Sequence, residues 1–395
     1  MRKNPLISLL AVGHACVDIY QGAVAALIPF FVAERDYTYA VAFGIVLAAS
    51  LLSSVAQPVF GALTDRWAMP WLLPVSTLLS GVGIGLSGLS GSYGLTLVLV
   101  AVSGIGVAAY HPESARAARL AARGSHSAMA WFSLGGNIGF ALAPLLVSAA
   151  IGHGSLRWTP VLVLPALAGA ALCVPVLRML GRPQAGTSKT STTRGGDDVA
   201  SFVKLSLAVV FRSIVFTGLS TFISLFAQQR MQGSATAGTV ALFLLFLGGA
   251  VGSVLGGSLA DRYDRVRVCR WSYLLSTAAV IGVICMPGPA LFLFVALTSV
   301  GLYVPFSLQV TLGQDYLPSR IGTAGGVTLG LTVSVGGLMS PLLGHLADST
   351  SLQTALTPLI AMPALSWLLF RTLPEPAAPE PRPAAPARQD ASLGS

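Results

Sequence analysis

The scarcity of charge is the feature that most limits what this chain can fold into. Only 9% of its 395 residues are Asp, Glu, Lys or Arg, and 54% are apolar, whereas soluble domains carry about 25% charged residues. So few charges cannot cover a surface exposed to water, and so much apolar content excludes a disordered chain. The 43 glycines and 24 prolines are compatible with membrane helices. The composition therefore predicts an all-α integral membrane protein.

Apolar stretches bounded by charged or Gly/Pro-rich residues predict twelve transmembrane helices, because one span needs about 20 residues. A polar, Gly/Ser/Thr-rich cytoplasmic linker at 181–201 separates an N-terminal six-helix bundle (1–180) from a C-terminal six-helix bundle (202–372). The Pro/Ala-rich tail at 373–395 is expected to be disordered. The predicted helices are 6–33, 38–63, 71–89, 94–120, 127–150, 157–180, 202–229, 236–259, 267–286, 289–314, 322–345 and 353–372.

The basic residues predict the orientation of these helices. Nineteen of the 23 Lys and Arg fall in segments that are cytoplasmic when the N-terminus is inside; Arg35, Arg157 and Arg230 fall outside, and Arg212 lies within a span. This asymmetry predicts that both termini are cytoplasmic. The net charge of +9 does not indicate a nucleic-acid partner, since the arginines lie singly between apolar stretches.

The two halves of the chain are copies of each other. Gly61-Ala-Leu-Thr-Asp-Arg-Trp67 recurs as Gly257-Ser-Leu-Ala-Asp-Arg-Tyr263 at an offset of 196 residues. At an offset of 197, Gly139 with Pro144-Leu-Leu matches Gly336 with Pro341-Leu-Leu. Parallel six-helix repeats are a transporter architecture with the binding site at the membrane midplane between the halves.

The repeated G-x-L-x-D-R loop resembles the signature loop of the major facilitator superfamily. Three further motifs resemble its fosmidomycin resistance protein branch: His14-x-x-x-Asp18, Tyr110-His-Pro-Glu-Ser-Ala-Arg116 and Gln314-Asp-Tyr-Leu-Pro-Ser-Arg-Ile-Gly322. The resemblance covers about residues 10–372, without the linker and tail. It implies a proton-driven antiporter that exports small drugs across the bacterial inner membrane and confers antibiotic resistance.

The sequence departs from the general antiporter pattern of that superfamily in three places. Leu95–Val102 contains no arginine where many relatives carry one, and Gly136–Pro144 matches the Gly-Pro antiporter motif only in part. The first repeated loop has Ala68-Met69 in place of a basic pair. The direction of transport therefore depends on the resemblance alone.

Asp18 is the only one of the 14 acidic residues that lies deep in a predicted span, about 18 Å from its start by helical rise. A lone carboxylate there costs about 2.5–3.5 kcal/mol, and burial favours its protonated form. His14 lies one turn away on the same face. The pair is either a neutral packing pair or, as we favour, the site that carries the coupled proton.

Arg212 is the only basic residue inside a span, on the seventh helix, which is the repeat equivalent of the first. An arginine does not lose its proton, so it needs an anion, either Asp18 or the substrate. A permanent structural ion pair and a substrate-binding role both remain open.

Tyr110, His111 and Glu113 end the fourth helix around Pro112, which bends it. They either relay protons and bind substrate or belong to the inner gate with Arg116. A metal is not expected, because no HExxH motif or third ligand accompanies these residues.

The repeated loops predict a cytoplasmic gate. Asp65 and Asp261 can cap helix N-termini, and Asp65 is expected to pair with Arg116 or Arg119 only when the cytoplasmic side is closed. The gate residues are Asp65, Arg66, Arg116, Arg119, Asp261 and Arg262.

The sequence thus predicts a secondary active transporter that exports a small drug or metabolite in exchange for protons by alternating access, as a monomer and without a cofactor. The alternatives are a proton-coupled importer of an organic anion and a membrane-embedded enzyme, for which no nucleophile is found. The further polar residues expected to line the cavity are Tyr20, Gln57, Asn137, Tyr303 and Gln309.

Overall fold

The computed structural model describes residues 5–67, 69–122, 126–152, 154–180, 196–319 and 321–376, and within these ranges it consists of helices without a strand. The elements are α1 (Pro5–Arg35), α2 (Tyr39–Arg66), α3 (Leu72–Ser87), α4 (Tyr93–Ala122), α5 (His126–Ile151), η1 (Leu156–Val163), α6 (Leu164–Leu180), α7 (Val199–Arg230), α8 (Ala235–Ala260), α9 (Arg265–Cys285), α10 (Ala290–Tyr316), α11 (Ile321–Ser349), α12 (Leu352–Leu356), η2 (Thr357–Ile360) and α13 (Ala361–Phe370).

These elements form twelve membrane-spanning segments, as predicted. Ten are long and apolar enough to cross a membrane over their described residues, and α3 and α11 complete the set. Two spans are composite, because η1 continues into α6 and α12 continues through η2 into α13. Pro160 lies in η1 and Pro358 in η2, and proline removes the N–H that a continuous α-helix needs.

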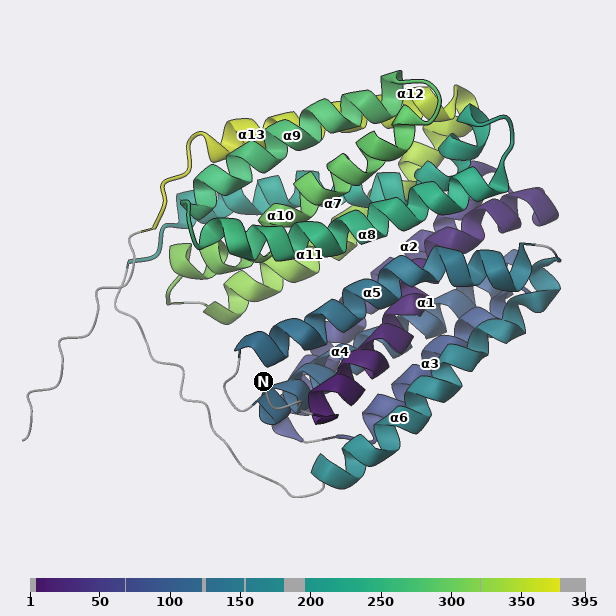
Figure 1. Ribbon diagram of the computed structural model, residues 1–395, viewed down its shortest axis with the longest axis horizontal. Coiled ribbons are helices and arrows are strands. Elements are labelled where there is room, and N and C mark those ends of the chain that lie inside the picture. Colours follow the sequence, from purple (N-terminus) through teal and green to yellow (C-terminus); the bar gives the residue numbers. More distant parts are fainter. Residues whose placement is uncertain are drawn as a thin grey trace, which may run out of the picture.

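The segments gather into two bundles (Figure 1). Elements α1–α6 pack mainly on one another and form the N-bundle, and α7–α13 form the C-bundle. The bundles meet through α2 with α11, α5 with α8 and α1 with α7. The backbone repeats the internal duplication: Asp36 and Gln232, 196 residues apart, have positive φ angles of 52° and 54° at equivalent turns.

The structure differs from the ranges predicted from the sequence at two boundaries, the start of the seventh span and the start of the C-terminal tail. Helix α7 begins at Val199 rather than at 202, because the Asp198 carboxylate caps it by accepting the backbone N–H of Ser201 at 3.0 Å. Hydrogen bonding to Ser201 lowers the pKa of Asp198. Residues 181–195 of the expected linker and 377–395 of the expected tail lie outside the described residues.

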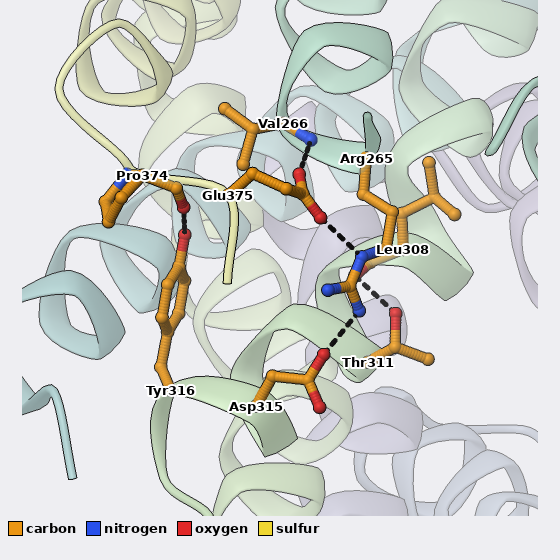
Figure 2. A network of polar contacts seen from close by, with 8 residues as sticks. All are labelled: Arg265, Val266, Leu308, Thr311, Asp315, Tyr316, Pro374 and Glu375. Carbon is orange, nitrogen blue, oxygen red and sulfur yellow. Dashed lines mark hydrogen bonds and ion pairs between the residues drawn. The ribbon is translucent and has the colours of Figure 1, made fainter. Parts of the chain in front are cut away.

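The first residues of the expected tail, 373–376, are held against the C-bundle. Glu375 accepts hydrogen bonds from Arg265 Nε and from the backbone N–H of Val266, both at 2.8 Å (Figure 2). Arg265 also pairs with Asp315 at 2.6 Å, and the Tyr316 hydroxyl donates to the Pro374 carbonyl at 2.6 Å. We call Arg265, Asp315 and Glu375 the C-terminal ion-pair network; it ties the chain after α13 to α9 and α10.

The bundles are joined at the end of the molecule that carries Asp348, which we call the Asp348 end; the opposite end, where α1 begins, is the Pro5 end. Asp348 of α11 accepts the backbone N–H groups of Tyr39 and Ala40, the first two residues of α2, at 2.8 and 2.9 Å. A carboxylate from the C-bundle therefore caps a helix of the N-bundle, where free N–H groups and the helix dipole favour negative charge.

Close packing accompanies this cap. A Cβ at Gly344 would lie 2.8 Å from Ala40 Cα, so only glycine lets α11 approach α2 here. Phe43 and Phe222 meet across the bundles with ring centroids 3.9 Å apart, and Gln229 donates to the Tyr39 hydroxyl at 3.3 Å. The Asp348 end is therefore closed by hydrogen bonds and by aromatic packing.

The Pro5 half of the interface between α5 and α8 is hollowed. An open apolar groove of about 300 Å³ lies between the two helices, and most of the side chains that line it are exposed. It is lined by Leu134, Ile138, Leu247, Ala250, Val251, Val254 and Leu255. The bundles thus pack less tightly here than at the Asp348 end.

Candidate functional site

Two helices of the N-bundle bring three ionisable side chains together. His14 and Asp18 lie one turn apart on α1, with His14 Nε2 3.3 Å from Asp18 Oδ2, and His111 Nε2 of α4 lies 3.2 Å from Asp18 Oδ1. His14 and Asp18 are buried, each 8% exposed. We call His14, Asp18 and His111 the acid–histidine cluster. The structure thus joins His111 to the pair that the sequence identified on α1.

The second nitrogen of each histidine is fixed by the backbone. His14 Nδ1 donates to the Phe132 carbonyl at 3.0 Å, and His111 Nδ1 donates to the Val107 carbonyl at 2.7 Å. A neutral imidazole that donates through Nδ1 has an unprotonated Nε2. Both Nε2 atoms then face the Asp18 carboxylate with a lone pair, and the carboxylate oxygens are acceptors too. These contacts are favourable only when a proton or another cation lies between the nitrogen and the oxygen. The cluster is built to hold positive charge.

The surroundings of the cluster keep its geometry tight. Phe132 stacks on His14 with ring centroids 4.4 Å apart, and the unpartnered hydroxyl of Tyr110 is fully buried close by. A Cβ at Gly136 would lie 2.5 Å from Asp18 Oδ2 and 2.7 Å from His14 Nε2. Gly136 therefore lets α5 pass directly against the two side chains.

The cluster is also the group of His, Cys, Asp and Glu residues in the described chain whose donor atoms could hold a metal, all within 4.8 Å of one another. The sequence argued against a metal because neither an HExxH motif nor a third paired ligand accompanied His111-Pro-Glu113 and His14-x-x-x-Asp18. That argument is incomplete, since the fold brings His111 of α4 to His14 and Asp18. Backbone carbonyls that orient both imidazoles are also what metal-binding histidines commonly have.

The C-bundle contains a buried cation without a counter-ion. Arg212 of α7 is 2% exposed, and over the described residues no hydrogen bond or ion pair reaches it. Its guanidinium lies over the Phe306 ring, 5.0 Å from the centroid. Asp18 is paired with histidines of its own bundle, so the direct Asp18–Arg212 ion pair considered from the sequence does not form in this conformation.

Two further polar side chains extend this site: Tyr273 lies near Arg212, and Gln309 lies beside Tyr273 and one turn along α10 from Phe306. The Tyr273 hydroxyl of α9 is within electrostatic range of the guanidinium and accepts a hydrogen bond from Gln309 Nε2 of α10 at 2.6 Å. Gln309 is 1% exposed, and its Oε1 has no partner among the described residues. We call Arg212, Tyr273 and Gln309 the arginine site. Tyr303 borders it, within electrostatic range of both Arg212 and Asp18.

The other expected cavity residues are placed differently. Tyr20 is fully buried within the N-bundle and donates to the Leu162 carbonyl at 2.9 Å, so it fixes α1 against η1 rather than lining a cavity. Gln57 is exposed on α2 and Asn137 is half-buried on α5. Gly136, the residue before Asn137, lies against the acid–histidine cluster instead.

The expected gate is only partly visible. The side chains of Asp65 and Arg119 lie outside what the structure describes. Arg116 pairs with Glu113 on its own helix, through Nε at 2.9 Å and through Nη2, which supports a structural role for Glu113 in this conformation.

The remaining gate residues sit at the surface. Arg66, Asp261 and Arg262 are exposed, and Arg66 lies over the Trp67 ring at 4.9 Å. The neighbouring Arg265, rather than Arg262, makes the ion pairs at this end of the C-bundle.

Sequence reasoning missed three groups of residues that contribute to these sites. Tyr273 carried a usable signal, as a tyrosine in an apolar span at the position equivalent to Thr77 in the first repeat. The backbone carbonyls of Phe132 and Val107 and the cap by Asp348 carried none, because they depend on how helices distant in sequence pack.

The fold and the paired sites define a class of protein. A family model described as Major Facilitator Superfamily matches residues 10–341, and the chain belongs to this superfamily. It is a multi-pass membrane transporter, not an enzyme.

Two relatives indicate which members of the superfamily this chain resembles. The fosmidomycin resistance protein of Escherichia coli (strain K12) is 30% identical over 376 residues, which cover 92% of this chain and 91% of that protein. The enterobactin exporter EntS of Escherichia coli (O1:K1) is 34% identical over 163 residues, 36% of this chain and 37% of that protein. The branch suggested by the sequence motifs is confirmed, and the second of these relatives is named as an exporter.

Solved structures agree on the fold. A bacterial homologue of the human lysosomal transporter Spinster, in an inward-facing and occupied conformation, has a TM-score of 0.78 at 15% identity, over 92% of this chain and 95% of that one. A variant of the Escherichia coli fucose:proton symporter FucP has a TM-score of 0.62 at 16% identity, over 92% of this chain and 97% of that one.

Proposed function

We propose that this transporter is a proton-coupled antiporter that exports a small compound bearing an anionic group across the bacterial inner membrane. The observation that carries the proposal is the pair of buried polar sites on repeat-related helices. The acid–histidine cluster lies on α1 and α4, and the arginine site lies on α7 and α10 with a contribution from α9.

Protons are the cations proposed for the acid–histidine cluster. Without an added proton, the two Nε2 lone pairs face the Asp18 carboxylate at 3.2 and 3.3 Å and repel it. A proton on one histidine turns the contact of that histidine with Asp18 into a charge-assisted hydrogen bond, and the second contact needs a second proton. Protonation therefore changes how strongly α1 and α4 attract each other, which is what couples an ion to a conformational change.

The anionic group of the substrate is proposed to bind Arg212. A buried guanidinium without a partner is costly, and an incoming carboxylate or phosphonate would satisfy it through two parallel hydrogen bonds. The phosphonate drug in the name of the relative from Escherichia coli is an anion of this kind.

The conformation is proposed to be inward-facing. The Asp348 end is closed by the contacts of α2 with α11, and the hollow between α5 and α8 lies in the Pro5 half. The excess of Lys and Arg supports a cytoplasmic Pro5 end, with both termini on that side. The single chain provides both sites, so a monomer suffices for this cycle.

The test is transport by purified protein in proteoliposomes that carry a pH gradient and a pH-sensitive dye. Exchange predicts that fosmidomycin added outside vesicles with an acidic lumen accelerates loss of the gradient, whereas import with protons predicts movement of drug and protons in the same direction. Metal binding by the cluster predicts that a chelator stops transport, and proton coupling predicts that it does not. Cys16→Ser is a matched control on α1, because Cys16 faces Gly169 of α6 rather than the cluster.

A further inference from the structure

Some buried polar atoms of the C-bundle have no hydrogen-bond partner, and they indicate more about the substrate than that it carries a negative charge. Over the described residues they include Arg212 Nε, which can only donate, and Gln309 Oε1, which can only accept. Both belong to side chains that are at most 2% exposed. An anion alone satisfies the arginine and leaves the amide oxygen unpaired.

Tyr273 adds a second donor. Its hydroxyl oxygen accepts the hydrogen bond from Gln309 Nε2 at 2.6 Å, and a tyrosine hydroxyl can donate one hydrogen bond while accepting another. The Tyr273 O–H is therefore able to point at an acceptor beside Arg212. The arginine site thus combines a cation, a neutral donor and a neutral acceptor on three different helices.

The first repeat shows that this combination is specific to the C-bundle. At an offset of 196, Arg212 and Tyr273 correspond to Cys16 and Thr77, and a Cβ at Gly169 would lie 2.8 Å from Cys16 Cβ and 3.1 Å from Thr77 Cγ2. The two positions therefore converge in the N-bundle also, but they carry no charge there.

The third position of the site has diverged in the same way. Gln309 corresponds to Glu113, whose carboxylate is taken up by Arg116. The equivalent of Arg116 is the buried Leu312, whose apolar side chain cannot engage the Gln309 amide oxygen.

We infer that the arginine site selects an acid whose anionic group carries its own hydrogen-bond donor, such as a phosphonate or phosphate ester in its singly ionised form. One ionised oxygen would receive hydrogen bonds from Arg212 and Tyr273, and the remaining P–O–H would donate to Gln309 Oε1. A sulfonate has the same charge and shape but no O–H, so it leaves the amide oxygen unpaired and facing an anion. This inference rests on the proposed function, in which Arg212 binds the anionic group.

The experiment compares phenylphosphonate with benzenesulfonate, measured by equilibrium binding to the purified full-length protein at a pH where both are monoanions. Wild type is expected to bind the phosphonate at least about tenfold more tightly, because a site built around a hydrogen bond rejects an analogue that lacks it. Gln309→Met keeps the length of the side chain and should bring the two affinities together by weakening only the phosphonate. Tyr273→Phe should weaken both compounds alike.

Matched variants separate this inference from the proposed function. Thr298→Val removes another unpartnered buried hydroxyl from α10, about three turns from Gln309, and should leave the ratio of affinities unchanged. Gln309→Glu has the native shape and supplies Arg212 with a carboxylate, so it should reduce binding of both anions even if Gln309→Met proves unstable.

Two results have different meanings. If wild type binds the two compounds equally, or if Gln309→Met and Gln309→Glu both leave the ratio and the affinities unchanged, the selection for a donor is wrong although the anion site stands. If neither compound binds and Arg212→Ala changes nothing, the proposed anion-binding function fails as well.

Discussion

The two bundles share a fold but bury opposite charges at related positions. In the N-bundle, α1 and α4 carry Asp18 with two histidines, and the cluster satisfies its charge within the bundle when it is protonated. In the C-bundle, α7 and α10 carry Arg212 and Gln309, whose free atoms have no partner over the described chain. Duplication therefore provides one scaffold twice, and in the proposed function a few substitutions assign one copy to the ion and the other to the substrate.

The largest effect is expected when the negative charge of Asp18 in the N-bundle is removed. Asp18→Asn leaves both imidazoles without an anionic partner, and transport driven by a pH gradient should therefore fall to background in proteoliposomes. Exchange of substrate without a gradient should persist, because the arginine site is intact. Wild-type rates of driven transport in this variant would show that Asp18 is only a packing residue.

The next largest effect is expected when Arg212 of the C-bundle is changed. Arg212→Lys keeps the charge but loses the planar, bidentate geometry, and it should weaken uptake of an anionic drug by roughly tenfold to a hundredfold. A cationic drug should be affected much less. Equal losses for both drugs, measured side by side with Arg212→Ala, would mean that Arg212 holds the helices together rather than binding an anion.

A smaller effect is expected where the bundles meet. Asp348→Asn turns one of two acceptors into a donor that faces a backbone N–H, which should cost about 1–1.5 kcal/mol and so raise opening of this end about tenfold. The measurement is the labelling rate of Leu47→Cys by a membrane-impermeant maleimide in a cysteine-free background. His345→Ala, on the same exposed end of α11, is the control, and an unchanged rate for Asp348→Asn would show that the aromatic packing alone keeps this end shut.

The smallest effect is expected from a difference between the two bundles at the Pro5 end. Glu375→Gln weakens the C-terminal ion-pair network, in which both side chains are partly exposed, and should reduce stability by about 1 kcal/mol without changing transport. The N-bundle has Met69 at the position equivalent to Arg265, so it has no arginine there to form a matching network. A thermal unfolding scan of the solubilised protein checks this, and a loss of transport would instead give the network a role in gating.

Much of the fold followed from the sequence because it depends on local properties. Apolar length determines a span, and the duplicated loops indicate the two bundles; all twelve spans are present, whereas the orientation expected from the charge asymmetry stays a prediction. His14 and Asp18 could be paired because residues four apart share a helix face. These inferences need no knowledge of how the helices pack.

The rest depended on packing between distant segments. Nothing local indicates that His111 reaches Asp18, or that Gly136 rather than Asn137 lies against it. The same holds for Asp348, whose partners are N–H groups 309 and 308 residues away in the chain. Tyr20 was misjudged because a tyrosine in an apolar helix looks the same in sequence whether its hydroxyl meets a cavity or a carbonyl.

The cap that Asp348 places on α2 has a consequence for how the transporter responds to its medium. When this end opens, the two N–H groups and the carboxylate must each be taken up by water, so anything that hydrates them shifts the balance of conformations. Small anions that bind to the exposed first turn of α2 would favour the open form of this end, and osmolytes that withdraw water would favour the closed form. In the orientation proposed above, the ions of the external medium would then influence which conformation the protein adopts at rest, separately from the substrate and the proton.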